Sequence, residues 1–302
     1  MNTSLPAWTI CALVSSVQLA AAAPLGPAPV VGGELARNDP AVVALTTHGG
    51  TIYCSGTLVS PSIIVTAAHC LHGLLPPVRV FIGTDPASDG LFVPVAWAIE
   101  HPDYAKKGLA DIGLVVLARP VTIRPVLLPE HDFAQHAPTG PLRLLGFGDT
   151  KPNDPHAVVG VKFERDVALA GVENYFLHYG VGACHGDSGG PTFAREADGT
   201  ERLVGVISRG DADCATGGYS TRVDLYRDWV ASWIENVDPA SCDLDLRCTA
   251  DCEALDPDCA NAATSTLPAS AGSAGGCMAG SGGGGLPLAL LVLGLALHRR
   301  RS

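Results

Sequence analysis

The segment that constrains this chain most is the run CHGDSGGP at residues 184–191. Its three glycines can adopt backbone dihedral angles that are closed to other residues, and they let the backbone pass close to another molecule. Between them, Ser188 can present a hydroxyl group and backbone N–H groups on one side of the chain. Acyl transfer needs such a nucleophile, together with donors for the oxyanion that forms on attack. Because a serine hydroxyl is a weak nucleophile, the segment also requires a base elsewhere.

Two further segments supply a base and an acid. His69 lies in the sequence TAAHC at residues 66–70, directly after the apolar run 63–65. Asp111 is the first residue of the largely apolar run DIGLVVL at residues 111–117. Alone, such a histidine is more often structural, and such an aspartate is more often a cap or a turn residue. Together, the three contexts in the order His, Asp, Ser resemble the trypsin/chymotrypsin family of serine proteases, whose catalytic triad has this order.

The resemblance covers residues 30–237 and implies an all-β, chymotrypsin-like fold. That fold has two six-stranded antiparallel β-barrels and a C-terminal helix. The residue pattern agrees with it, because residues 40–125 and 126–222 contain short β-rich runs separated by Gly, Pro and Asp turns. Leu225, Trp229 and Trp233 recur at four-residue spacing, which predicts a helix over residues 224–237.

The resemblance also implies a role for each residue of the site. His69 would accept the proton of Ser188 and later give it to the leaving group, while Asp111 would orient the imidazole. The N–H groups of Gly186 and Ser188 would form the oxyanion hole. Ser208 would support Asp111, and the backbone from Ser208 to Gly210 would pair with the substrate as an added strand. No cofactor and no metal ion is expected.

The substrate pocket follows from the same resemblance. Its expected residues are Gly182, Ala183, His185, Ser208, Gly210 and Gly218. Trypsin-like members carry an aspartate where this chain has Gly182, at the pocket floor. Without it, a basic substrate side chain would bury its charge unpaired. We therefore expect cleavage after apolar or aromatic residues, with Asp211 and Asp213 as alternative sources of negative charge.

The run VVGG at residues 30–33 resembles the Ile-Val-Gly-Gly that begins active members of the family. The resemblance implies that this protein is a zymogen, and that cleavage frees the Val30 amino group to pair with Asp187. Pro29 precedes Val30 here, where an activating protease of trypsin type would require Arg or Lys. Either a different protease releases Val30, or activation differs from that of the family; alternatively, Val30 and Val31 only begin the first strand.

The chain has ten cysteines, which indicates an oxidising compartment. The resemblance implies the disulfides Cys54–Cys70 and Cys184–Cys214. A second group forms a small acidic module over residues 238–260, which is too short to bury a core and would need disulfides. Calcium or zinc binding is the alternative there. The cysteines of that group are Cys242, Cys248, Cys252 and Cys259.

Both ends of the chain carry targeting signals. Residues 1–23 resemble a secretory signal peptide, with a short buried helix as the alternative, and residues 24–29 form a short propeptide. Residues 261–277 form a flexible linker. Residues 278–302 contain a short apolar run that is followed by an arginine cluster. As a helix the run would be about 18 Å long, which is less than the roughly 30 Å thickness of a bilayer core.

This tail, with Cys277 before it, resembles the tripartite MYXO-CTERM sorting tails of myxobacteria. That resemblance implies attachment to the membrane or the outer cell surface and processing of the tail. The alternative is a permanent transmembrane anchor with its arginines in the cytoplasm.

These observations predict a monomeric serine endopeptidase that is secreted or lies at the outer cell surface and acts on polypeptides. Lys and Arg number 19 against 30 Asp and Glu, and the resulting net charge of −11 argues against a nucleic-acid partner. One alternative is a catalytically silent binding or adhesion protein on a protease scaffold. The other is a serine esterase of a different fold, which the order His, Asp, Ser disfavours.

Overall fold

The computed structural model describes residues 32–73, 77–88, 90–133, 135–149, 159–196 and 198–239. All of them belong to the first of the two compact units of the chain, Met1–Ala263. The predicted signal peptide, the propeptide, Val30, most of the cysteine-rich module, the linker and the sorting tail lie outside the described residues. No helix among the described residues is long and apolar enough to cross a membrane.

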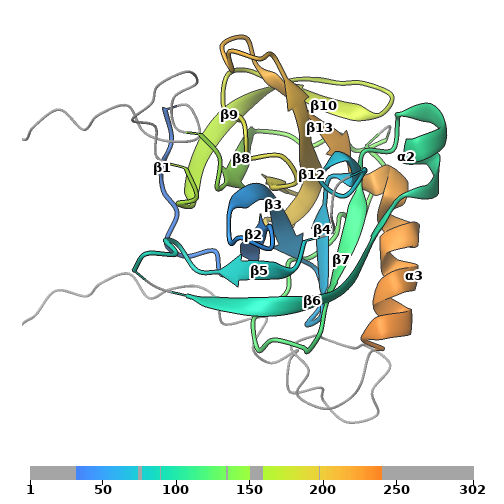
Figure 1. The fold of residues 1–302 in the computed structure, drawn as a ribbon. Coiled ribbons are helices and arrows are strands. Elements are labelled where there is room, and N and C mark those ends of the chain that lie inside the picture. The colour runs from blue at the N-terminus through green and yellow to red at the C-terminus, as the bar shows by residue number, and fades with distance from the viewer. Residues whose placement is uncertain are drawn as a thin grey trace, which may run out of the picture. The chain divides into compact units, whose positions relative to one another are not determined.

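The first half of the described chain forms a closed antiparallel barrel in the order β2-β3-β4-β7-β6-β5 (Figure 1). Its strands are apolar runs such as VVALT and GLVVL that are buried along their whole length, because the barrel interior covers one face and other elements cover the second. The strands are β2 (Val42–Thr46), β3 (Ile52–Leu58), β4 (Ile63–Thr66), β5 (Arg79–Ile82), β6 (Leu91–Glu100) and β7 (Gly113–Leu117).

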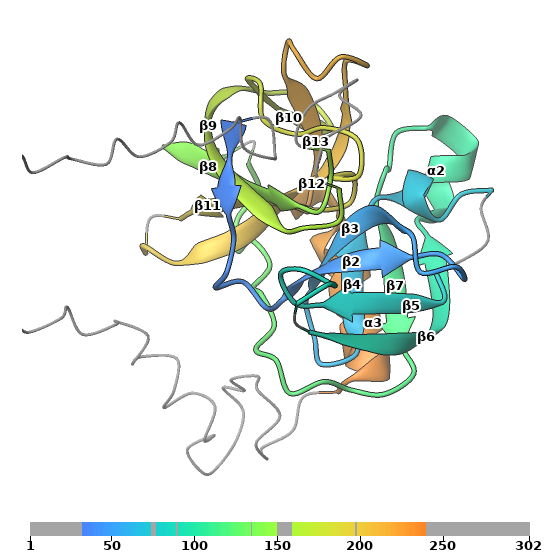
Figure 2. The same cartoon turned by 60° about the vertical axis from the view of Figure 1, so that its left-hand side comes forward.

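The second half forms a sheet in the order β1-β9-β10-β13-β12-β11-β8, and an additional pairing of β9 with β8 closes six of these strands into a barrel. Figure 2 shows the two barrels as separate groups of strands. The strands are β1 (Glu34–Leu35), β8 (Pro141–Gly146), β9 (Phe163–Val172), β10 (Phe176–Tyr179), β11 (Pro191–Arg195), β12 (Glu201–Gly210) and β13 (Gly218–Arg222). The prediction of two six-stranded antiparallel barrels is therefore confirmed.

The helical elements are short and lie outside the barrels. They are the 3₁₀ turns η1 (Ala68–Cys70) and η2 (Asp224–Tyr226) and the helices α2 (Pro102–Lys107) and α3 (Arg227–Val237). The predicted helix over residues 224–237 is thus divided into a 3₁₀ turn and an α-helix. Asp224 does not cap it, because its carboxylate binds the Arg222 guanidinium and the Phe133 N–H.

Helix α3 packs against β4 of the first barrel (Figure 1). It buries Val230 and Ile234, which join the hydrophobic core of that barrel. The helix ends at Val237 because the next residue, Asp238, precedes a proline, and a residue in that position disfavours helical geometry. The Asp238 carboxylate then accepts hydrogen bonds from the Ser62 N–H at 2.7 Å and the Ser62 hydroxyl at 2.9 Å.

A single hydrophobic core joins the two barrels. It includes most of the buried side chains of the first barrel and also Leu145, Phe147, Phe193 and Leu203 of the second. A smaller cluster fills the remainder of the second barrel and includes Leu142, Leu144 and Tyr179. Because one core spans both barrels, loops from either barrel are held at fixed positions where the barrels meet.

Candidate active site

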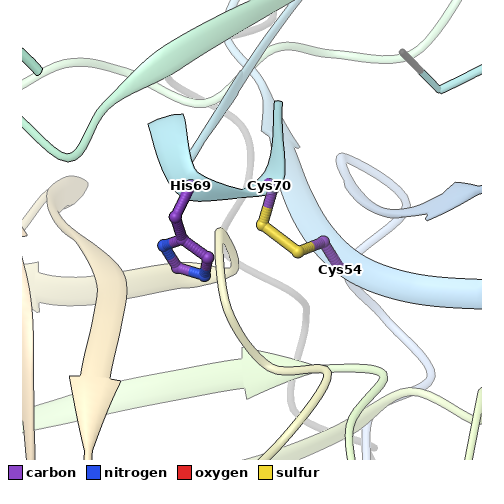
Figure 3. Close-up of side chains that lie close together, drawn as sticks. All are labelled: Cys54, His69 and Cys70. Carbon is purple, nitrogen blue, oxygen red and sulfur yellow. A yellow bond between two sulfur atoms is a disulfide. The ribbon is translucent and has the colours of Figure 1, made fainter. Parts of the chain in front are cut away.

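His69 lies on the 3₁₀ turn that follows β4. Its neighbours Ala68 and Cys70 are buried, and the disulfide Cys54–Cys70 ties the turn to β3. Figure 3 shows the imidazole projecting from this turn beside the disulfide. The His69 side chain is 33% exposed, so a rigid and otherwise buried turn presents one imidazole ring to solvent.

Asp111 orients this imidazole from the residues that lead into β7. One carboxylate oxygen of Asp111 accepts the His69 backbone N–H at 2.9 Å. The other oxygen lies 2.8 Å from His69 Nδ1 and 2.6 Å from the Ser208 hydroxyl, which donates to it. Burial raises the pKa of Asp111, but the hydrogen bonds from His69 and Ser208 outweigh it and hold the pKa below its usual value. An ionised carboxylate only accepts, so Nδ1 carries the proton and Nε2 is left to act as a base.

Ser188 belongs to a tight loop between β10 and β11 in the second barrel. Gly186 and Gly189 have φ values of +92° and +82°, which favour glycine. A Cβ atom on Gly189 would lie 2.1 Å from Thr66 Oγ1, so a larger residue would collide with the first barrel. The Ser188 carbonyl oxygen lies 3.7 Å from Cys70 Sγ, next to the turn that carries His69.

Backbone N–H groups on both sides of Asp187 are free within the described residues. The N–H groups of Gly186 and Ser188 make no hydrogen bond within the described part of the chain, whereas those of Asp187, Gly189 and Gly190 all do. Free N–H groups two residues apart in a loop with a positive φ can converge on one anion. This loop can therefore stabilise an oxyanion that forms at Ser188.

The structure identifies Ser55 as a residue that holds this loop, a role that sequence analysis missed. Ser55 is fully buried in β3 of the first barrel. Its hydroxyl donates to the Gly186 carbonyl at 2.9 Å and accepts the Phe147 N–H at 3.0 Å, while its own N–H donates to the Ser188 carbonyl at 2.8 Å. The only signal in the sequence is a small polar residue directly after Cys54.

Asp187 is completely buried beneath the loop. Its carboxylate accepts the backbone N–H of Gly148 at 2.9 Å and that of Cys184 at 2.8 Å. Burial raises the pKa of Asp187 to about 7, although these two backbone hydrogen bonds act in the opposite direction. Gly146 and Gly148 leave the space for it, because a Cβ on Gly146 would lie 2.1 Å from Asp187 Oδ1.

A pocket of about 210 Å³ opens beside Ser188. Sequence analysis predicted Ala183, His185, Ser208, Gly210 and Gly218 as pocket residues, and all five line it together with Ile207. The disulfide Cys184–Cys214 forms part of its wall.

Gly182 is not among the residues that line this pocket. A Cβ there would lie 2.8 Å from Leu144 and from Val167, inside the core of the second barrel. The fully buried Tyr179 side chain lies next to Gly218. A Cβ atom added to Gly218 would lie 2.8 Å from the Tyr179 hydroxyl oxygen, so Tyr179 leaves no room for a side chain there.

Asp211 also lines the pocket, but its carboxylate is already occupied. It accepts hydrogen bonds from the N–H groups of Ala215 and Thr216 and from the Thr216 hydroxyl, at 3.0 to 3.1 Å. The backbone hydrogen bonds from Ala215 and Thr216 lower the pKa of Asp211. Asp211 therefore shapes the loop that bounds the pocket.

Two clusters near the site have the composition of metal ligands. They are Cys54 with His69 and Cys70, and Cys184 with His185 and Cys214. In each cluster the two cysteines form a disulfide and so offer no thiolate.

Comparison with known proteins places residues 30–230 in a match to the family model described as Trypsin. A trypsin from Saccharopolyspora erythraea is 33% identical over 66% of this chain and 95% of its own length. Glucanase inhibitor protein 3 from Phytophthora infestans is 29% identical over 62% of this chain and 80% of its own. The suppressor of tumorigenicity 14 protein homolog from Bos taurus is 32% identical over 68% of this chain and 28% of its own.

Proposed function

The chain belongs to the trypsin family of serine endopeptidases, and we propose that it cuts polypeptides after apolar or aromatic residues through an acyl-enzyme on Ser188. The observation that carries the mechanism is the pair of hydrogen bonds from His69 to Asp111, at 2.8 and 2.9 Å. It is supported by the free N–H groups of Gly186 and Ser188. In the proposal, His69 is the base and these N–H groups form the oxyanion site for Ser188.

In this proposal each group has one role. His69 Nε2 takes the proton of the Ser188 hydroxyl as its oxygen attacks the scissile carbonyl, and later gives it to the leaving amine. The N–H groups of Gly186 and Ser188 hold the oxyanion. Loss of one oxyanion-hole donor typically raises the activation free energy by about 3–4 kcal/mol. Asp111 stabilises the imidazolium. Water then attacks the acyl-enzyme by the same sequence and releases Ser188.

The pocket composition supports the substrate preference. Its lining includes Ala183, Ile207 and two glycines. Asp211 is the one acidic residue among those that line the pocket, and its carboxylate is engaged with its own loop, so a lysine or arginine side chain would find no free carboxylate there. Since burying an unpaired charge costs several kcal/mol, apolar side chains are favoured.

We propose that removal of residues up to Pro29 activates the enzyme. The buried Asp187 carboxylate has a raised pKa and no cationic partner among its hydrogen-bond donors. A free Val30 amino group would supply that charge. Export through residues 1–23 and surface attachment through the C-terminal tail complete the proposal, since a disulfide-containing protease requires an oxidising compartment.

The second candidate is a binding protein on the same scaffold. It is favoured by the resemblance to glucanase inhibitor protein 3, whose name describes an inhibitor. The hydrogen bonds among His69, Asp111 and Ser208 argue for catalysis instead, because binding alone does not require them.

A fluorophosphonate probe separates these candidates. The protein is recovered from its native host, and its intact mass is measured before and after labelling. We expect a chain that begins at Val30 and gains one adduct, which Ser188→Ala abolishes. Unlabelled enzyme from the same preparation is then given peptides that differ only in the residue before the scissile bond, and those with Leu and Phe should be cut faster than those with Arg and Lys. A chain that begins at Val30 and takes no adduct would instead support the binding protein.

A further inference from the structure

Arg209 stands between two residues of the site. Strand β12 carries Ser208, which bonds Asp111, and Gly210, which lines the pocket. The pairing of β12 with β13 shifts register between Ile207 and Arg209. Such an irregularity re-aims side chains: Ser208 is buried, whereas the exposed Arg209 lines the same pocket as Ser188.

Aromatic rings hold the Arg209 side chain in place. Its guanidinium carbon lies 4.1 Å from the centre of the Phe176 ring and 5.3 Å from that of Tyr219. Tyr219 is the cross-strand neighbour of Arg209, and the His178 ring stacks on the Tyr219 ring with their centres 4.6 Å apart. Contact between a guanidinium and ring faces is attractive and reduces the freedom of the side chain. It leaves the N–H groups at the guanidinium edge free to donate.

The charge of Arg209 has no carboxylate partner within the described residues. By contrast, Arg143, Arg202 and Arg222 of the same barrel each bind two or three carboxylates. The chain has a net charge of −11, so acidic groups that could pair with an arginine are in excess. Within the described chain the guanidinium of Arg209 nevertheless stays unpaired beside the pocket, where it can bind an anionic group of a ligand.

We propose that Arg209 is a specificity-determining residue that binds an acidic side chain of the substrate, two to four residues before the scissile bond. This inference rests on the proposed function. A substrate strand that pairs with the backbone from Ser208 to Gly210, as the family resemblance implies, runs alongside Arg209, and the proposal assigns to this strand the residues before the cut. The planar guanidinium can donate two parallel hydrogen bonds to one carboxylate, a geometry that an amide cannot match.

The test uses matched peptides with one apolar residue before the scissile bond and either Glu or Gln at the second, third or fourth position. Active sites are counted in a separate sample with the fluorophosphonate probe, and kcat/KM is measured for the activated parent enzyme, which begins at Val30, and for its variants Arg209→Gln and Arg209→Lys. We expect Glu to exceed Gln by roughly two- to fivefold at one position, as for an exposed ion pair. Arg209→Gln should remove this ratio, and Arg209→Lys should retain part of it.

Arg119→Gln is the matched control, because Arg119 is exposed and does not line the pocket. It changes the net charge equally and should leave the Glu-to-Gln ratio intact. Equal cleavage of all Glu and Gln peptides, or a preference that survives in Arg209→Gln, would overturn the inference while leaving the peptidase function standing.

If no peptide is cut, the proposed function fails, and the same peptides are tested for binding to Ser188→Ala by fluorescence anisotropy. Tighter binding of a Glu peptide that Arg209→Gln abolishes would still support the inference. Equal binding of Glu and Gln peptides would refute it.

Discussion

At the scale of single residues, the Asp111 carboxylate depends on a hydroxyl from the other barrel. Ser208 donates to the same oxygen that faces His69 Nδ1, at 2.6 Å. We predict that Ser208→Ala lowers kcat about tenfold or more, because a hydrogen bond to a charged group contributes about 1.5–3 kcal/mol. KM should change little for a substrate with a small side chain. Steady-state kinetics over a range of pH checks this prediction.

Ser232→Ala on the exposed surface of α3 serves as its control. A Ser208→Ala enzyme with unchanged kcat would show that His69 and Ser208 do not act on Asp111 together.

Asp187 gives the uncleaved chain a distinctive pH dependence. Burial raises its pKa from 3.8 to about 7, so the folded chain binds a proton that the unfolded chain has released. The stabilisation from this proton is complete below about pH 4 and is lost as the pH rises through about 7. We predict that the free energy of unfolding falls over this window by a few kcal/mol, and that release of Val30 removes the fall. Denaturant unfolding of both forms measures it.

Asp166→Asn, an exposed substitution, should keep the same pH profile as the uncleaved parent. A profile that is identical in the uncleaved and the cleaved chain would contradict the pairing of Val30 with Asp187.

Short motifs in the sequence predicted the residues that surround the site, because glycines and polar residues in an apolar chain are conspicuous. Ser55 and Arg209 were missed for a physical reason. Their roles depend on neighbours that are 131 residues away, in the case of Ser55 and Gly186, or on rings from another strand. Gly182 was predicted at the pocket floor, and its packing against Leu144 and Val167 depends on the barrel core, which no local pattern reveals.

At the scale of elements, β3 positions the nucleophile loop through Ser55. We predict that Ser55→Ala destabilises the protein by about 2 kcal/mol, since two hydrogen bonds of about 1 kcal/mol each are lost and the Phe147 N–H is left buried. Activity should fall further than stability explains, because Gly186 loses its anchor. Thermal unfolding and kcat measured at 25 °C, well below Tm, separate the two effects.

Ser88→Ala on an exposed turn is the corresponding control. A Ser55→Ala protein with reduced stability and full kcat would show that the loop keeps its shape without this contact.

Apolar runs predicted most strands, but β6 shows where the pattern fails. Pro94 in the middle of this ten-residue strand would ordinarily predict a break. The strand continues because Pro94 pairs with Arg79 of β5 and lies opposite the end of β7, where its carbonyl accepts the Ala118 N–H and the pairs with β7 begin only at Val95. Whether a proline ends a strand therefore depends on its partner strand, which the local sequence does not identify.

At the scale of the whole molecule, hydrogen bonds attach the C-terminal end of the described domain to the first barrel. Asp238 accepts hydrogen bonds from Ser60 and Ser62 of the first barrel, directly after α3. We predict that a chain shortened to end at Pro239 keeps its Tm within about 2–4 °C, the shift that 1 kcal/mol produces in a domain of this size. It should also keep its kcat/KM.

A chain that ends at Asn236 lacks Val237 and Asp238 and should unfold at a clearly lower temperature. Equal Tm values for the two shortened chains, measured by circular dichroism, would contradict the role of Asp238.

The division of the site between two barrels has a consequence for inactivation. His69 and Asp111 come from one barrel, and Ser188 and Ser208 from the other. Enzymatic activity therefore depends on the exact relative position of two separately closed sheets. Circular dichroism, by contrast, measures only whether the sheets themselves are formed. Pressure, cosolvent or gentle heating that shifts one barrel relative to the other would abolish activity, while the circular dichroism spectrum would remain that of the native protein.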